Sequence, residues 1–186
     1  LNHPRIRFVE CDLAESEDIS KLLKKTKFSS VIHLAAQAGV RVSLDDWGKY
    51  ARDNLQAFSN LLVGAAKSSI KNFLYASSSS VYGNSQETRF TESKSVPVPV
   101  SFYGASKLSN EILAASTSFV TGMKTRGLRF FTVYGPWGRP DMVYFRMVAS
   151  AFTQEPFDFF GTGQVERDFT YIADVVAMIM ELESEL

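Results

Sequence analysis

The chain has 186 residues, of which 45% are hydrophobic, and its 20 basic residues balance 20 acidic ones to a formal net charge of zero. This composition is ordinary for a globular domain with its own core; no basic stripe favours nucleic-acid binding, and no apolar stretch approaches the roughly 18 residues of a membrane-spanning helix. The single cysteine, Cys11, excludes an intrachain disulfide and indicates a reducing compartment, so that we expect a cytoplasmic protein.

Short apolar runs alternate along the chain with segments of helical periodicity. The pattern predicts strands over residues 6–13, 29–36, 72–79 and 125–135, and helices over residues 16–25, 53–67 and 103–119. A further helix is indicated by "AMIMELESEL" at residues 177–186. Because the strands are almost continuously apolar, helices should cover both faces of the sheet. We therefore predict an α/β fold with a doubly wound parallel sheet.

Polar or glycine-rich residues follow each predicted strand. Asp12 ends the first strand, "AAQAGVR" (35–41) follows the second, four serines (77–80) end the third, and "TVYGPWGRPD" (132–141) follows the fourth. In sheets of this type, ligands bind beyond the carboxyl ends of the strands. Any one of these segments is also what an ordinary loop looks like, but the four together predict one ligand-binding cleft.

The segment "SFYGASKLSNEI" places Tyr103 and Lys107 four residues apart on a predicted helix, and therefore on the same face. A lysine ammonium beside a phenol favours the phenolate and lowers the phenol pKa from about 10. Such a tyrosine can act as a general base at a sugar hydroxyl. The pair also arises by chance on surface helices, but here it follows a strand that ends in serines. We expect Ser78 to be the third member of the site, hydrogen-bonded to the same substrate oxygen.

Five stretches resemble, in their order and spacing, the extended short-chain dehydrogenase/reductases of the nucleotide-sugar epimerase and dehydratase group. They are "VIHLAAQAGVRVSL", "NFLYASSSSVYGN", "YGASKLSNE", "LRFFTVYGPWGRPDM" and "RDFTYIADV". The resemblance implies a Rossmann-like fold with NAD as cofactor and a UDP-sugar as substrate. It also implies a homodimer, with no nucleic acid and no membrane among the partners.

The resemblance assigns a role to each matching position. Tyr103 would be the catalytic base, assisted by Ser78, while Lys107 would also hold the nicotinamide ribose. The remaining cofactor-binding positions are Asp12 at the adenine, Leu34, Ala35, Ala36 and Gln37 along the diphosphate and ribose, Asn54 in support, and Tyr134 near the nicotinamide. On the substrate side, Arg41 and Ser43 would approach the sugar, and Arg167 the UDP diphosphate.

The residues beside Ser78 indicate which reaction to expect. Relatives that dehydrate the sugar carry an Asp-Glu pair at the positions of Ser79 and Ser80, and hydroxyls cannot replace that acid and base at pH 7. We expect C4 epimerisation, with UDP-glucuronate converted to UDP-galacturonate through a transient 4-keto sugar. Arg139 would hold the sugar carboxylate through two parallel hydrogen bonds, with Ser79, Ser80 and Thr132 as neutral donors. The alternative for Arg139 is an ion pair with Asp141.

Other readings stay open at this point. UDP-glucose 4-epimerase and UDP-glucuronate decarboxylase are the alternative enzymes, and an NAD(P)-binding redox sensor or scaffold is the alternative without catalysis. The resemblance implies an NAD-binding domain over 1–134 and a nucleotide-sugar-binding region over 135–186, part of which returns to the core. The family's G-x-x-G-x-x-G turn is not in these residues, so we expect an internal fragment that lacks the first βαβ unit and the end of the substrate domain. No residues have metal-ligand spacing.

Overall fold

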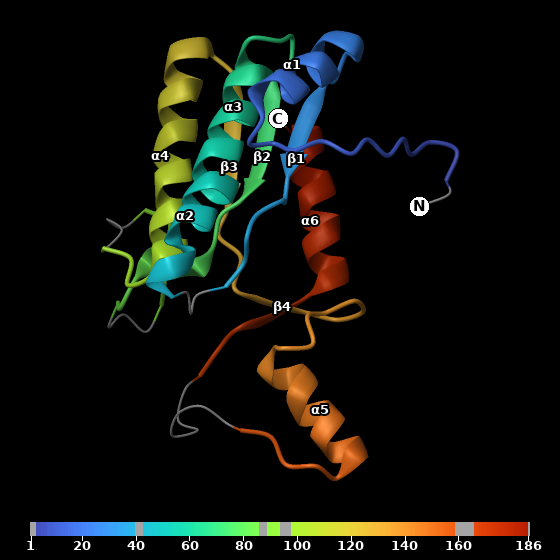
Figure 1. Ribbon diagram of the computed structural model, residues 1–186, viewed down its shortest axis with the longest axis vertical. Helices are drawn as coiled ribbons and strands as arrows, with labels where there is room; N and C mark the ends of the chain where they lie inside the picture. Colours follow the sequence, from blue (N-terminus) through green and yellow to red (C-terminus); the bar gives the residue numbers. More distant parts are fainter. Residues whose placement is uncertain (1–2, 40–42, 86–88, 94–97, 159–165, 186) are drawn as a thin grey trace. The chain divides into compact units, whose positions relative to one another are not determined.

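The computed structural model describes residues 3–39, 43–85, 89–93, 98–158 and 166–185 (Figure 1). Its helices are α1 (Ser16–Lys25), α2 (Trp47–Tyr50), α3 (Ala57–Ala66), α4 (Phe102–Thr121), α5 (Val143–Thr153) and α6 (Ile172–Glu185). Its strands are β1 (Ser30–His33), β2 (Asn72–Ala76), β3 (Lys124–Leu128), β4 (Thr132–Tyr134) and β5 (Phe169–Tyr171). Shorter helical segments are η1 (Leu44–Asp46), η2 (Ala51–Gln56) and η3 (Ser79–Tyr82).

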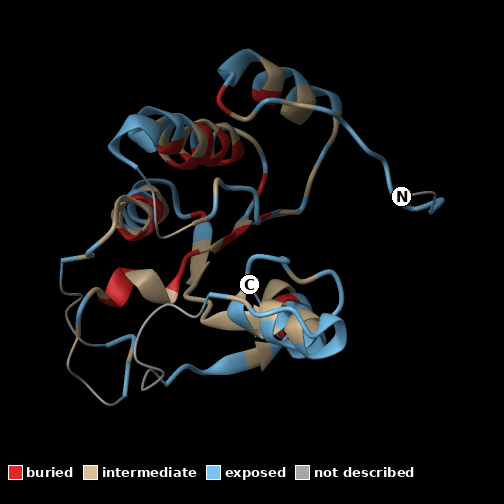
Figure 2. Cartoon of the chain, turned by 60° about the horizontal axis from the view of Figure 1, so that its bottom comes forward, coloured by how far each residue is buried: buried red, intermediate tan, exposed pale blue. Residues whose placement is uncertain are grey.

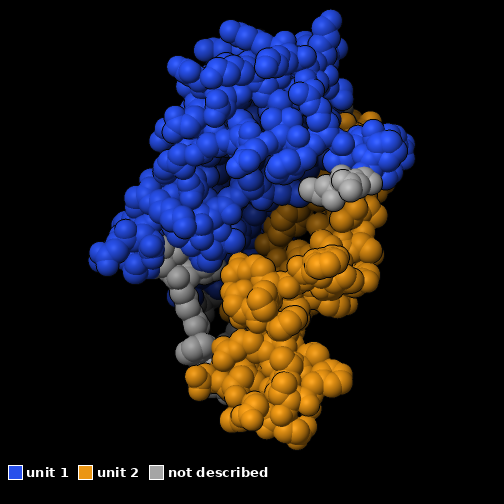
Figure 3. Space-filling model, turned by 45° about the vertical axis from the view of Figure 1, so that its right-hand side comes forward, with its two compact units in different colours: residues 1–129, 186 blue, residues 130–185 orange. Residues whose placement is uncertain are grey.

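The chain forms two compact units, coloured separately in Figure 3. The first comprises residues 1–129, and the second comprises residues 130–185. Each unit is described by itself below. The division into an NAD-binding domain over 1–134 and a sugar-binding region over 135–186 is a division by function, and it stays a prediction.

The first unit contains a three-stranded parallel sheet in the order β1-β2-β3. Ile32 of β1 lies opposite Leu74 of β2, and Leu74 lies opposite Arg126 of β3. Because the strands are parallel and adjacent, their carboxyl ends at His33, Ala76 and Leu128 lie along one edge of the sheet. This is the edge at which the sequence analysis places the ligand site.

Helices α1, α3 and α4 contribute to one hydrophobic core against the sheet. The fully buried side chains Phe58 and Leu62 of α3 meet Phe73 of β2, Ile19 of α1 and Ala114 of α4. In Figure 1, α3 and α4 lie side by side, and buried residues are frequent in the elements of this unit (red in Figure 2). The apolar 3–4 spacing of residues 16–25 and 53–67 is therefore a spacing of core contacts. On α4 the apolar residues Ile112 and Phe119 are exposed, and Ala114 packs into the core instead.

The second unit is built around a short parallel pair of strands, β4 and β5. Four aromatic rings pack there: Tyr134, Tyr144, Phe169 and Tyr171, with centroid separations of 5.5 to 6.5 Å. Helix α6 follows β5 directly, and it buries Val175 and Ile179. Helix α5 and strand β5 were not predicted from the sequence.

Two of the predicted strands are wrong. Residues 6–13 form no strand, because a strand needs a partner for its backbone groups and none is found among the described residues; Phe8 is 73% exposed. The single strand predicted over 125–135 is two strands in two sheets. The chain leaves the first sheet after Leu128, and β4 pairs with β5.

Candidate active site

Helix α4 carries the predicted catalytic residues on one face. Lys107 is buried, and its Nζ donates a hydrogen bond to the carbonyl of Ala76 at 2.8 Å. The same Nζ lies 5.8 Å from the centroid of the Tyr103 ring, so the two side chains do come together as predicted. Burial lowers the pKa of Lys107 to about 8. Burial and the Lys107 charge also lower the pKa of His33 to about 4, which makes His33 a neutral core residue at pH 7.

The first turn of α4 lies against the serine segment that follows β2. Ser101 caps the helix, because its Oγ accepts a hydrogen bond from the amide of Gly104 at 3.0 Å. A Cβ at Gly104 would come within 2.7 Å of the carbonyl oxygen of Ser80. Only glycine permits this approach of backbone to backbone, and it sets how near Tyr103 stands to the serines.

The serines themselves form a capped turn. Ser78 is buried and precedes η3, and its Oγ accepts a hydrogen bond from the amide of Ser80 at 3.1 Å. Its hydroxyl also lies 3.1 Å from the Oγ of Ser80. Ser79 and Ser80 begin η3 and are only partly buried. Ser78 therefore has a fixed position at the end of β2, one residue beyond Ser77 and beside the first turn of α4.

Asn54 connects the segment after β1 with helix α4. Its Oδ1 accepts from the amide of Gln37 at 2.8 Å, and its Nδ2 donates to the carbonyl of Gln37 at 3.0 Å. The same Nδ2 lies 3.3 Å from the Oγ of Ser106, which donates to the carbonyl of Tyr103 at 2.8 Å. The side-chain Nδ2 of Asn110 donates to the backbone carbonyl of Asn54 at 3.0 Å. Asn54 thus fixes Gln37 through two hydrogen bonds to its backbone, while its supporting role at a cofactor stays a prediction.

The residues predicted to line NAD have the chemistry that such a ligand requires. Leu34 is 55% exposed, and Ala35 and Ala36 are also exposed, so this backbone is accessible from solvent. A charged lysine has three N–H donors, and among the described residues Lys107 uses one of them on Ala76. A buried cation with further donors beside small side chains fits a ribose diol. Asp12 is exposed, and its carboxylate is held by Arg52, whose hydrogen bond lowers the pKa of Asp12.

The predicted substrate residues are only partly placed together. Ser43 precedes η1, and its Oγ donates to Asp46 at 2.8 Å, while Arg41 lies outside the described residues. Ser79 and Ser80 belong to the first unit, whereas Thr132, Arg139 and Arg167 belong to the second, together with the predicted cofactor residue Tyr134. Among these, Arg139 forms two parallel bonds with Asp141, which is the alternative that the sequence left open. Arg167 is exposed, and it donates to the carbonyl of Glu166.

Sequence reasoning did not identify several residues that shape the site. The ion pair between Glu111 and Arg129 is the largest omission, with 16% of each side chain exposed and an Nη2–Oε2 distance of 2.7 Å. Glu111 stands four residues after Lys107, and helical spacing alone could have placed it on the catalytic face. Its partner Arg129 lies on another element and had no local signal. The cap at Ser101 was readable, since a serine precedes an apolar helical run.

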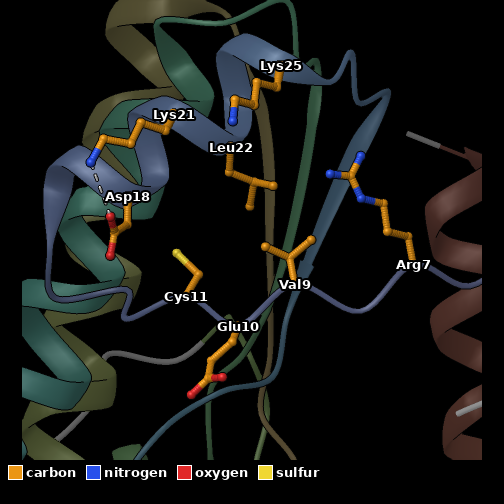
Figure 4. Close-up of a pocket in the computed structure, with 8 residues that line it drawn as sticks. All are labelled: Arg7, Val9, Glu10, Cys11, Asp18, Lys21, Leu22 and Lys25. Carbon is orange, nitrogen blue, oxygen red and sulfur yellow. Dashed lines mark ion pairs between the residues drawn. The ribbon is translucent and has the colours of Figure 1, made fainter.

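A cavity of ≈ 200 Å³ lies between the N-terminal segment and α1, away from the predicted catalytic residues (Figure 4). It is lined by Arg7, Val9, Glu10, Cys11, Asp18, Lys21, Leu22 and Lys25. The Nζ of Lys21 pairs with Asp18 at 3.6 Å, and charges of both signs surround the opening. None of these residues is a predicted site residue, so the cavity does not define the active site.

The residues that the structure describes contain neither a metal site nor a membrane-spanning helix. Within those residues, no cluster of three or more His, Cys, Asp or Glu side chains could hold a metal ion. In the same part of the chain, no helix is both long and apolar enough to cross a membrane.

The chain belongs to the NAD-dependent epimerase/dehydratase family, and the sequence model of that family matches residues 1–184. It is 41% identical over 180 residues to UDP-glucuronate 4-epimerase 4 of Arabidopsis thaliana, an alignment that covers 95% of this chain and 41% of that protein. The chain spans about half the length of the curated relatives it matches. The family predicted from the five sequence stretches is therefore confirmed.

Solved structures agree with this assignment. One is the UDP-glucuronic acid 4-epimerase from Bacillus cereus in complex with UDP-glucuronic acid and NAD, with a TM-score of 0.88 and 36% identity over 98% of this chain and 57% of that one. Another is the UDP-N-acetylglucosamine 4-epimerase from Methanobrevibacter ruminantium M1 in complex with UDP-N-acetylmuramic acid, with a TM-score of 0.90 and 28% identity over 98% and 59%. The Rossmann-like α/β fold class of the sequence analysis is confirmed.

Proposed function

We propose that the protein containing this chain is an NAD-dependent 4-epimerase of a UDP-sugar, with UDP-glucuronate as the substrate. The observation that carries the proposal is the buried Lys107 ammonium, which lies between the carbonyl of Ala76 and the ring of Tyr103. A buried cation costs stability, and an exposed lysine would cost none. Its position beside a phenol favours the phenolate and supports proton transfer as the role of this pair.

The chain's own residues supply the proton chemistry. Tyr103 takes the proton of the sugar C4 hydroxyl and later returns it, and Ser78 hydrogen-bonds to the same oxygen. NAD would supply the hydride chemistry at C4, as acceptor and then as donor to the other face of the sugar. Lys107 and Gln37, with the exposed backbone of residues 34–36, would hold the cofactor, with Asp12 at its adenine and Tyr134 at its nicotinamide. Tyr103 is thus the group whose loss should stop the reaction.

The carboxylate of the sugar is the basis for preferring UDP-glucuronate. Oxidation at C4 makes this substrate a β-keto acid, which loses CO₂ when the C5–C6 bond stands perpendicular to the carbonyl plane. An epimerase must therefore hold the carboxylate, and Arg139 has the planar guanidinium for a two-point contact. Thr132, Ser79 and Ser80 are the proposed neutral donors around it. In the same proposal, Arg41 and Ser43 contact the sugar, and Arg167 contacts the UDP diphosphate.

A specific observation favours a second candidate. The guanidinium of Arg139 already forms two bonds with Asp141, so a sugar carboxylate would have to compete with that partner. A UDP-glucose 4-epimerase needs no such arginine. UDP-glucose therefore belongs in every assay as the neutral comparison.

The test uses the full-length protein with UDP-glucuronate and with UDP-glucose. We expect interconversion of UDP-glucuronate and UDP-galacturonate, and we expect Tyr103→Phe to lower turnover by about 10² or more while NAD is still bound. Near-normal turnover of this variant would remove Tyr103 from the mechanism. Arg139→Ala should lower kcat/KM for UDP-glucuronate by an amount that corresponds to about 2–4 kcal/mol of transition-state stabilisation. The variant should also form some UDP-pentose by decarboxylation. If the wild type prefers UDP-glucose, the proposed carboxylate contact is wrong and the protein is better described as a UDP-glucose 4-epimerase.

A homodimer in the cytoplasm completes the proposal. Helix α4 carries Ile112, Phe119 and Val120 with 62%, 94% and 77% of their surfaces exposed, and apolar residues of this size support burial against a second copy. The free thiol Cys11 supports a reducing compartment. Sedimentation of the full-length protein and of its Phe119→Glu variant tests the dimer, which the charged variant should dissociate.

A further inference from the structure

Three polar side chains from three elements meet at the end of β2. Glu111 of α4 accepts two bonds from Arg129, from Nε at 2.9 Å and from Nη2 at 2.7 Å. The Oγ of Ser77 donates to Oε1 of the same carboxylate. Ser77 is buried, and its amide bonds to the carbonyl of Leu128 at 2.8 Å. The cluster therefore joins α4 to the ends of β2 and β3 at the residue that directly precedes Ser78.

Glu111 lies one helical turn after Lys107, and both residues bond to the chain at the end of β2. Lys107 and Glu111 are four residues apart on α4, and they bind the last residue of β2 and the residue that follows it. Lys107 holds the carbonyl of Ala76, and Glu111 holds the hydroxyl of Ser77. Two consecutive turns of the catalytic helix thus fix two consecutive residues immediately before Ser78.

Arg129 also reaches the far end of the serine segment. Its guanidinium carbon lies 4.8 Å from the centroid of the Tyr82 ring, and Tyr82 is the last residue of η3. A guanidinium over an aromatic face is attracted to it, more strongly where water is excluded. One arginine therefore holds both ends of the segment: Ser77 through Glu111, and Tyr82 directly.

We propose that Glu111, fixed by Arg129, is a positioning residue that acts through Ser77 and sets where the Ser78 hydroxyl stands relative to Tyr103. The inference rests on the proposed function, since Ser78 is given a role only in that reaction. A buried ion pair is weak evidence for stability, because apolar residues of the same volume often serve as well. A fixed hydroxyl, in contrast, needs a directional partner. Small displacements at a reacting centre are sufficient to slow a reaction strongly.

The experiment is a double-mutant cycle in the full-length protein, assayed with UDP-glucuronate and UDP-glucose. Ser77→Ala removes the hydroxyl that Glu111 holds, and it leaves the ion pair in place. We expect this variant to lower kcat roughly tenfold with unchanged KM, unchanged bound NAD and an unfolding midpoint close to that of the wild type. In a Ser78→Ala background, the same change should cause no further loss of kcat, because its effect passes through Ser78.

A matched control is Ser109→Ala, on the same helix. Among the described residues its Oγ bonds within α4, to the carbonyl of Ala105 at 2.9 Å, and the variant should keep the kcat of the wild type. Losses that add in the double variant, or a Ser77→Ala enzyme of normal kcat, would overturn the positioning role while the epimerase activity stands. A wild type that is inactive on both UDP-sugars would overturn the proposed function and this inference with it.

Discussion

Two arginine–carboxylate pairs, one in each unit, have the same two-bond geometry in different surroundings. Arg129 and Glu111 meet in the first unit with 16% of each side chain exposed, whereas Arg139 and Asp141 meet in the second unit with 51% and 60% exposed. Both arginines form two parallel bonds with their carboxylate. Burial decides what such a pair is worth: in water the attraction is largely screened, and in the interior a lost partner leaves an uncompensated charge. We therefore expect the first pair to be a fixed part of the fold, and the second to contribute little to stability.

The strongest test of this comparison removes Arg129, the less exposed of the two arginines. Arg129→Met should destabilise the full-length protein by about 3–5 kcal/mol, because the Glu111 carboxylate loses its partner at a place where only 16% of its side chain is exposed. Urea unfolding at pH 7 measures the loss. A loss below about 1 kcal/mol would show that this pair behaves as an exposed one.

Gly104 tests how tightly the first unit is packed at the same helix. Gly104→Ala should cost about 1–3 kcal/mol, since the new Cβ would stand 2.7 Å from the carbonyl oxygen of Ser80 and one backbone must move. Turnover should fall as well, because the displacement separates Tyr103 from Ser78. Gly48→Ala is the matched control, because nothing lies within 4 Å of a Cβ there. Equal stability of the two variants would contradict the close contact.

Removing the buried charge of Lys107 should raise the free energy of unfolding, whereas removing Arg129 should lower it. Its folded-state pKa of about 8 lies below the roughly 10.4 of an unfolded lysine, so the unfolded chain binds more protons between these values and wild-type stability rises with pH there. Lys107→Met removes the buried charge and the bond to Ala76. At pH 7 it should stabilise the full-length protein by about 1–2 kcal/mol while turnover is lost.

The gain should shrink as the pH is raised to 10, where the folded wild type no longer carries this charge. Lys67→Met, at an exposed position, controls for the loss of a lysine as such, and its stability should not differ from the wild type at either pH. A Lys107→Met protein less stable than the wild type at pH 7 would show that the ammonium contributes more to folding than its desolvation costs.

The exposed arginine completes the comparison with the smallest effect. Arg139→Met should change the free energy of unfolding by less than about 0.5 kcal/mol, because solvent screens its pair with Asp141. The same urea titration measures it beside Arg129→Met. A loss as large as that of the buried arginine would mean that exposure does not separate the two pairs.

Local patterns explain which features were predictable from the sequence. The helix over 16–25 and the pairing of Tyr103 with Lys107 depend on residues close in the chain, and the structure has both. The strand over 6–13 failed because a strand depends on a partner that its own residues do not specify. The break between β3 and β4 was hidden because the aromatic and β-branched residues 130–134 follow Leu128 almost directly and favour a continued strand. The bond from Ser77 to Glu111 joins residues 34 positions apart, beyond any local pattern.

The hydrogen bonds of Asn54 in the first unit depend on the number of residues in η2. Here the amide of Ala57 bonds to the carbonyl of Arg52 five residues earlier, so the helix runs from Trp47 to Ala66 with one wider turn inside it. That turn leaves the carbonyl of Asn54 for Asn110 of α4 and aims its side chain at Gln37. Deleting one residue would return the helix to ordinary i→i+4 winding, and the carbonyl of Asn54 would then be taken up within the helix and lost to Asn110. In proteins that share this site, the amino-acid types within η2 should therefore vary more readily than the number of residues in it.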